Sequence, residues 1–212
     1  MLTSRICILA ITLAGAVHGT TFGTNLIVNG DAESFTMVDP LTTDGIADFA
    51  GWTRTGDVFR NTYMLHGNFV YITDPGTEAF GSGYFLGGDQ ASTQLTQSIF
   101  IGDQSVLIDS GLVDFQLRGW MTAARQSPTG AIDTVTLGVR FLDGLGHNPG
   151  GTGIASPDQA ALTLAGSPVT AQQYSDLRVS VGVVPTGTRS LDVSMAGVRR
   201  GELNFAVLEN HQ

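Results

Sequence analysis

The strongest constraint on the fold is a regular alternation of apolar and polar residues within positions 112–142. In residues 113–121 every second side chain is apolar or glycine, and the intervening ones are polar or aromatic. Residues 135–141 repeat the pattern after a Gly/Pro break at 126–130. Because successive side chains of a strand point to opposite faces, each segment predicts a strand with one buried face. We expect these two strands to form a half-buried antiparallel pair.

Further short apolar segments bounded by turn residues predict strands at 25–30, 52–55, 58–63, 69–72, 83–88, 92–101, 177–183, 190–195 and 203–208. We expect 52–55 and 58–63 to pair around Gly56-Asp57, and the apolar set beginning at Leu177 to face inward. Residues 143–157 form a predicted glycine-rich loop. No amphipathic helix longer than about three turns is predicted. The pattern therefore favours an all-β fold, a two-sheet antiparallel jelly-roll β-sandwich.

Composition restricts the class of partner. A chain of 212 residues with 42% hydrophobic content is sufficient for one β-rich domain with its own core. The formal net charge is −9, and all ten basic residues are arginine. No basic stripe of the kind that binds nucleic acid or an anionic membrane is present. The absence of lysine and the abundance of glycine indicate a bacterial, GC-rich source.

Residues 1–19 have the pattern of a secretory signal peptide. Arg5 precedes a short apolar run at 6–13, small residues follow at 14–16, and a second possible cleavage position follows Gly19. The apolar run is too short to span a bilayer comfortably, so no membrane span is expected after signal removal. We therefore expect a secreted protein whose single domain comprises residues 20–212.

The only cysteine, Cys7, lies inside this predicted signal peptide. The exported domain would then contain no disulfide bond. Such a domain depends on its hydrophobic core or on a bound ion for stability.

Several short motifs occur in an order that is similar to a known superfamily: Asn25–Glu33, Gly51-Trp52, Gly83–Phe85, Val184–Arg189 and Asn204–Asn210. Together they resemble galactose-binding-like jelly-roll domains. That superfamily includes many carbohydrate-binding modules, plant cell-wall proteins of the DUF642 kind and F-box-associated sugar-binding domains. The resemblance extends from about residue 24 to the end of the chain, and it implies that Trp52 packs inward. The chain departs from the family pattern at Glu209, where the family commonly has Asp.

The resemblance also implies a structural Ca²⁺ that holds the first acidic turn against the last strand. By position, Glu33 and Glu209 would be its carboxylate ligands, supplemented by backbone carbonyls. The alternative is that Asp31 and Glu33 only cap a turn.

A sugar-binding face is the second candidate site. Trp120, Arg118 and Gln116 share the polar parity of the first central strand, and the polar parity of the other strands adds Arg140, Arg178 and Asp192. An indole stacks on the apolar face of a pyranose, while charged and amide groups hydrogen-bond its hydroxyls. Alternatively, Trp120 is covered by the loop at 143–157 or belongs to a second small core.

Catalysis is the least favoured function. Asp109, Asp114, Asp133 and Asp143 are available, but no sequence pattern pairs two of them for glycoside cleavage. No histidine cluster at metal-ligand spacing and no nucleophile elbow is present. We therefore expect no enzymatic activity and predict non-covalent binding of a carbohydrate or surface glycan at the cell surface or in the extracellular matrix. A structural or adhesive protein that binds other proteins is the alternative, and a small polysaccharide-active enzyme is a weaker third.

Overall fold

The structure is a computed structural model of the whole chain. It describes residues 10–14, 23, 25–38, 46–62, 83–88, 90–125, 134–149, 159–165, 167–168, 176–198 and 206–209. For residues 10–14, 61–62, 120, 122–125, 159–165, 167–168, 176–177 and 206–209 it describes the backbone alone.

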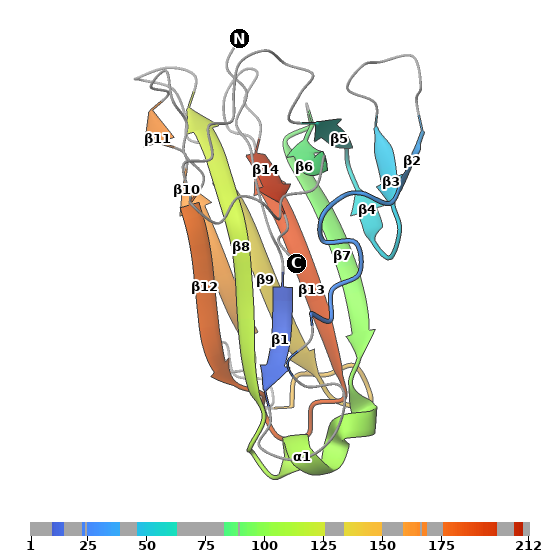
Figure 1. Cartoon of the computed structure of the whole chain (residues 1–212), viewed down its shortest axis with the longest axis vertical. Helices are drawn as coiled ribbons and strands as arrows, with labels where there is room; N and C mark the ends of the chain where they lie inside the picture. The colour runs from blue at the N-terminus through green and yellow to red at the C-terminus, as the bar shows by residue number, and fades with distance from the viewer. Residues whose placement is uncertain are drawn as a thin grey trace.

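Two antiparallel sheets make up the body of the molecule (Figure 1). The larger, seven-stranded sheet contains β1 (Ala10–Ala14), β5 (Val58–Thr62), β6 (Gly83–Gly87), β8 (Asp114–Arg125), β11 (Ser167–Pro168), β12 (Asp176–Val183) and β14 (Ala206–Glu209). The five-stranded sheet has the order β10 (Gln159–Ala165), β9 (Thr134–Leu142), β13 (Ser190–Val198), β7 (Ser92–Phe100) and β4 (Thr53–Thr55). A small β2 (Phe35–Met37) and β3 (Ala47–Phe49) ribbon lies at one end, and β11 is the one parallel addition to β8.

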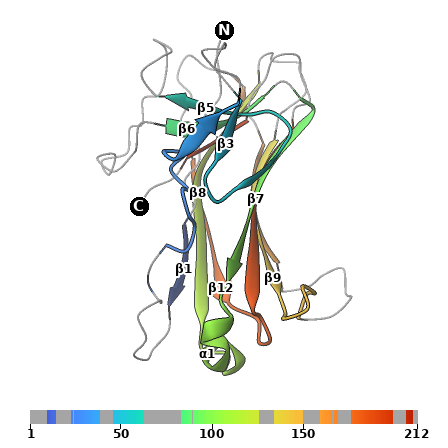
Figure 2. The same ribbon diagram turned by 90° about the vertical axis from the view of Figure 1, so that its right-hand side faces the viewer.

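The core lies between the two sheets, which Figure 2 shows edge-on. Alternate residues of β8 and β9 are buried, as are those of β7 and β13: Phe115, Leu117, Met121, Val135, Leu137, Val139, Phe141, Leu95, Leu191, Val193 and Met195. A 3₁₀ turn, η2 (Gly102–Gln104), and the short helix α1 (Ser105–Asp109) close the bottom of the sandwich with buried Ile108. The predicted all-β, two-sheet antiparallel fold is therefore confirmed.

The pairing predicted for the central strands is wrong. β8 and β9 have the expected alternation, but β8 pairs with β12 and β14, whereas β9 pairs with β10 and β13. The two strands face each other across the core instead of lying in one sheet. The pairing predicted between β4 and β5 is also wrong, because β4 pairs with β7 and β5 pairs with β6. A strand's apolar face shows that it is covered, and it does not show whether the covering strand lies beside it or above it.

The face predicted for β12 is also wrong. Its register places Val179 opposite Arg118, and Gly182 opposite the inward-facing Phe115. Cross-strand partners share a face, so the valines of β12 point outward; Val179, Val181 and Val183 are 47%, 69% and 54% exposed. The Phe115 ring lies against Gly182, where an added Cβ would be 2.8 Å from Cε1. The bulky ring of β8 therefore requires glycine on the inner side of β12, and the valines take the outer side.

The strand predicted at 25–30 does not form: residues 26–27 are irregular and 28–31 form a turn, which runs into the predicted acidic turn at 31–33. Two residues in this segment, Asn29 and Ala32, have positive φ angles of 51° and 56°. The buried Trp52 holds this turn, because its Nε1 donates hydrogen bonds to the carbonyls of Val28 (3.0 Å) and Asn29 (3.2 Å). The inward packing expected for Trp52 is thus confirmed.

The N-terminal segment contributes one strand. Residues 10–14, which lie within the predicted signal peptide, form β1 along residues 114–118 of β8. The cleavage itself stays a prediction. β10 was not predicted, and the strand expected at 69–72 lies outside the described residues. Within the described part of the chain, no helix is long and apolar enough to cross a membrane.

Candidate functional site

The outer face of the five-stranded sheet gathers a polar cluster from three neighbouring strands. In the middle strand, β13, Asp192 lies opposite Arg140 of β9 on one side and Ser98 of β7 on the other. The residues that flank Asp192 in sequence, Leu191 and Val193, are fully buried. The alternation of the strand therefore directs Asp192 and its two cross-strand neighbours away from the core.

The three side chains are joined through the Asp192 carboxylate. Arg140 Nη2 donates to Oδ2 at 2.8 Å, and Ser98 Oγ donates to Oδ1 at 2.6 Å. The Arg140 side chain is 57% exposed and that of Asp192 is 26% exposed. An ion pair this open to water contributes only about 0–1 kcal/mol to folding, so stability alone gives it little purpose. A carboxylate has roughly four acceptor positions and a guanidinium five donors, so both groups keep hydrogen-bonding capacity towards solvent.

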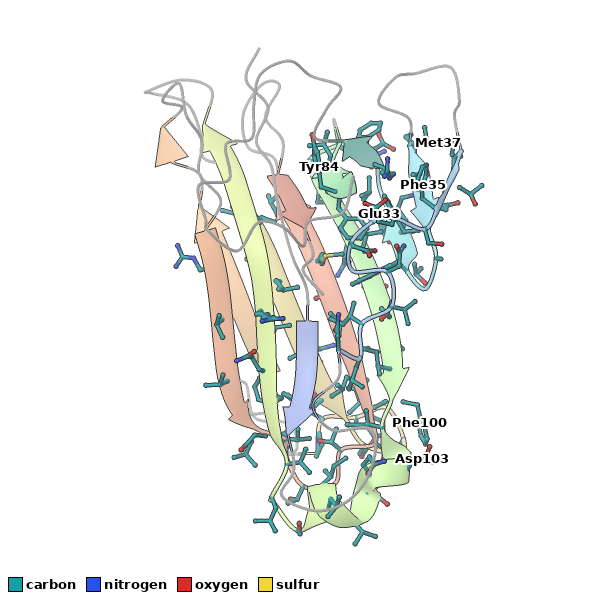
Figure 3. All side chains as sticks on the ribbon, viewed as in Figure 1. Glu33, Phe35, Met37, Tyr84, Phe100 and Asp103 are labelled. Atoms are coloured by element: carbon teal, nitrogen blue, oxygen red, sulfur yellow. The ribbon has the colours of Figure 1, made fainter. Side chains whose placement is uncertain are left out.

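An exposed aromatic ring lies on the same face. Phe100 ends β7 two residues beyond Ser98, pairs with Ser190, and is 70% exposed. Its ring lies over Gly102, where any side chain would collide with it. Figure 3 shows the ring projecting from the end of β7 beside Asp103. Phe100 and Asp192 are diagonal neighbours on adjacent strands, and such neighbours are about 7–8 Å apart, so the two residues lie near each other on this face.

Gln94 and Val198 also lie on this outer face, and most of its other described positions carry small and hydroxyl side chains. They come from β4, β7, β9 and β13: Thr53, Thr55, Thr96, Thr136, Gly138, Ser194 and Ala196. Such a surface is shallow and rich in hydroxyl groups. It leaves the Asp192 cluster and the Phe100 ring accessible to a ligand that lies along the sheet.

The structure does not bring the six predicted sugar-binding residues together. Gln116, Arg118 and Trp120 belong to β8 in the other sheet, where Gln116 and Arg118 are half-buried on the outer face opposite Val181 and Val179. The backbone of Trp120 lies opposite Leu177 and Glu209, and its side chain lies outside the described part of the structure.

Arg178 lies on neither outer face. It pairs with Gly119 on the inner parity of β12, which corrects the prediction that it shares a face with Arg118. Within the predicted set, the structure shows a hydrogen bond between Arg140 and Asp192.

Ser98 and Phe100 were missed by the sequence reasoning. The alternation of residues 92–101 already indicates that they point away from the core, since Thr93, Leu95 and Gln97 are the inward positions. What the sequence lacks is the neighbour: nothing in it shows that β7 pairs with β13 at a register that sets Ser98 opposite Asp192.

The two predicted calcium ligands approach the same strand, β6. The Glu33 carboxylate accepts a hydrogen bond from the Gly83 backbone N–H at 2.7 Å, and β14, which ends at Glu209, pairs with β6 through Leu208 and Phe85. The Glu209 side chain lies outside the described part. Within the described residues, no three His, Cys, Asp or Glu side chains form a group that could hold a metal ion.

Two of the carboxylates considered for catalysis have structural partners. Asp109 accepts hydrogen bonds from Arg189 (2.7 and 3.0 Å) and from the Gly187 N–H (2.9 Å), and these lower its pKa, the Arg189 side chain most. Asp143 accepts from the N–H groups of His147 and Leu145, which lower its pKa in that order. Both groups fix loops at the α1 end of the sandwich.

No protein-family model matches the chain, and no curated protein matches it. Similar solved structures include carbohydrate-binding modules. One is a family 16 carbohydrate-binding module, with 14% identity, a TM-score of 0.45, and coverage of 89% of this chain and 98% of that one. Another is the TmCBM61 module in complex with β-1,4-galactotriose, with 10% identity, a TM-score of 0.43, and coverage of 76% and 87%.

Two longer chains are also similar over part of their length. A tailspike protein of bacteriophage CBA120, described as an enzymatically active domain, is 16% identical with a TM-score of 0.42. The present chain covers 19% of that protein. It also covers 25% of a Clostridium thermocellum endo-1,4-β-D-xylanase structure with a family 22 carbohydrate-binding module, at 12% identity and a TM-score of 0.38.

Proposed function

We propose that this protein is a secreted, non-catalytic carbohydrate-binding protein that acts at a cell surface or in an extracellular matrix, and that sugar binds to the outer face of its five-stranded sheet. The observation that carries the proposal is the placement of the Asp192–Arg140–Ser98 cluster and the exposed Phe100 ring on one open face.

The chemistry of the cluster matches that of a sugar. A pyranose presents C–H groups on its faces and hydroxyls around its edge. The Phe100 ring offers an apolar surface for stacking, while Asp192 accepts hydrogen bonds from hydroxyls and Arg140 donates to them. The ion pair holds both charged groups in place before the ligand arrives, which reduces the entropy lost on binding.

The shallow surface favours a ligand that extends along the sheet over one enclosed in a cavity. The small side chains of β9 and β13 leave room for further sugar units next to the one at Phe100. We therefore expect an oligosaccharide or the side of a polysaccharide chain to bind better than a free monosaccharide. Binding of this kind has a modest affinity, because few groups are fully removed from water.

A structural or adhesive role is the second candidate, and one observation favours it. The outer side of β12 presents a row of three exposed valines, Val179, Val181 and Val183, next to Gln116 and Arg118. An apolar row on a strand surface suits contact with another protein better than contact with hydroxyl groups.

A glycan-array screen of the purified protein separates the two candidates. Asp192→Ala and Phe100→Ala should each abolish binding or weaken it at least tenfold while thermal unfolding stays unchanged, because both residues are at the surface. Gln116→Ala and Trp120→Ala probe the other sheet and should bind as the unmodified protein does.

The opposite pattern, with binding lost in Trp120→Ala and kept in Asp192→Ala, would move the site to the seven-stranded sheet. Absence of binding to every glycan would favour the protein-binding role.

A further inference from the structure

The acidic turn that was expected to bind calcium is held by an arginine from β5. Arg60 Nη2 donates to Glu33 Oε2 at 3.1 Å, and Arg60 Nε donates to the carbonyl of Ala32 at 3.0 Å. The second Glu33 oxygen, Oε1, accepts from the Gly83 N–H at 2.7 Å. One guanidinium thus engages a carboxylate and a backbone carbonyl, two of the kinds of oxygen ligand that Ca²⁺ takes in proteins.

The guanidinium fits closely into the place that it occupies. The Arg60 side chain is 12% exposed, and its guanidinium carbon, Cζ, lies 4.5 Å from the centroid of the Phe35 ring. On the side of β6, a Cβ at position 83 would lie 2.6 Å from both Nε and Nη2. Any residue except glycine there would displace the arginine. Figure 3 shows Glu33 among Phe35 and Tyr84 at this end of the sandwich.

These surroundings suit a planar cation and do not suit a calcium ion. An aromatic ring on one face attracts a guanidinium but supplies no oxygen, whereas Ca²⁺ needs about six to eight oxygen ligands around it. A second cation at Glu33 would also lie beside the positive charge of Arg60 and be repelled by it. The side chains that the structure describes around Glu33 therefore do not fit calcium at this carboxylate.

We propose that Arg60 is an internal cation that takes the structural role predicted for calcium, and that the turn at 29–33 is held without a metal. The turn contains two strained residues with positive φ, Asn29 and Ala32, so it needs a fixed contact to persist. Arg60 donates its hydrogen bond to the carbonyl of Ala32, which is one of these two residues. The hydrogen bond between the Gly83 N–H and Glu33 connects the turn to β6.

Arg60 holds the same turn that the family resemblance implicates in calcium binding, and this role is independent of the proposed sugar site. The Arg60 contacts account for the acidic turn in this sequence without a metal ion. The mature chain is expected to contain no disulfide bond. At this turn, the guanidinium of Arg60 supplies the positive charge that a bound metal ion would otherwise supply. The stability of the chain then does not depend on the calcium concentration outside the cell.

Thermal unfolding of the full chain tests the proposal in two ways. The unmodified protein should unfold at the same temperature in excess EDTA and in millimolar calcium chloride, and titration with calcium chloride should release no binding heat. Arg60→Ala should lower the unfolding temperature in both solutions, because the Glu33 carboxylate and the Ala32 carbonyl lose their donor.

Arg54→Ala is the matched control. Arg54 also pairs with an aspartate, Asp48, at 2.8 Å and donates to the Gly56 carbonyl at 2.7 Å. Arg54 and Asp48 are 22% and 60% exposed, against 12% and 35% for Arg60 and Glu33, so Arg54→Ala should lower the unfolding temperature much less. A drop of the unmodified protein's unfolding temperature in EDTA that calcium restores would overturn the proposal. So would an Arg60→Ala variant as stable as the unmodified protein. If Arg60→Ala does not fold, the calcium titration of the unmodified protein still decides the question.

Discussion

The rings of Phe115 in β8 and Phe141 in β9 lie 5.0 Å apart, tilted by 56°, and join the two sheets towards the α1 end of the core. The two strands are consecutive along the chain, yet they meet through their side chains and share no ladder. This contact explains why each strand has one apolar face and why the pair does not form a hairpin.

Truncation of the Phe141 ring should be severely destabilising. Phe141 is fully buried, and its replacement by alanine leaves a cavity between the two sheets. The sheets cannot shift locally to fill this cavity. We expect Phe141→Ala to lower the free energy of unfolding by about 3–5 kcal/mol. Urea unfolding followed by circular dichroism measures this. Leu145→Ala, at a position 80% exposed, should change it by less than about 0.5 kcal/mol. Equal effects of the two substitutions would contradict the two-sheet core.

The indole N–H of Trp52 should contribute separately from its ring. Trp52→Phe keeps most of the apolar volume but removes the donor to the Val28 and Asn29 carbonyls. We expect a loss of about 1–3 kcal/mol, because those carbonyls are left without this donor in a partly buried turn. The same urea experiment checks it, and a variant as stable as the parent would show that water replaces the indole.

Acid should destabilise the α1 end of the sandwich first. The pKa of Asp109 is held below its ordinary value of 3.8, chiefly by the Arg189 side chain and then by the Gly187 N–H. A lowered pKa stabilises the fold above the unfolded-state value, and this stabilisation is lost as the pH falls through the folded-state pKa. Asp109→Asn should therefore lower stability at neutral pH and flatten its decline below about pH 4.

Urea midpoints measured from neutral pH into the acid range provide the readout for this prediction. Asp103→Asn, an exposed carboxylate in the adjoining η2, is the control. Parallel pH curves for Asp109→Asn and the parent would show that the Arg189 contact does not form in solution.

Removal of the predicted signal peptide should expose one part of a sheet edge. β1 pairs with residues 114–118 of β8, while β14 begins its pairing at Trp120. We expect a chain that starts at residue 20 to fold, since every buried core residue whose side chain the structure describes lies beyond that point. In hydrogen exchange, the β8 amides facing β1 should lose protection, whereas those of β9 should keep it. Unchanged protection at 114–118 would mean that another segment takes the place of β1.

The local features of the candidate site could be predicted from the sequence. Arg140 and Asp192 alternate with buried residues in long, regular strands, so their outward direction follows from the period of two. The prediction that Arg178 faces outward was wrong, for a reason that the period of two cannot reveal. An alternating segment has two faces, and in β12 the ring of Phe115 decides which one is turned inward.

The same distinction applies to the acidic turn. The sequence alone shows a carboxylate beside a turn in a chain with a predicted signal peptide, which is consistent with calcium. Arg60 lies 27 residues away along the chain, and only the folded structure places its guanidinium on Glu33.

The sequence by itself determined the all-β class, the position of most of the long strands and the buried faces of β7, β8, β9 and β13, because these depend on local alternation and turn composition. The tertiary structure decided which strands are neighbours, which face of β12 is covered, and which charged groups meet. Those outcomes depend on contacts between residues far apart in the chain, such as Ser98 with Asp192, and no local pattern encodes the register that brings them together.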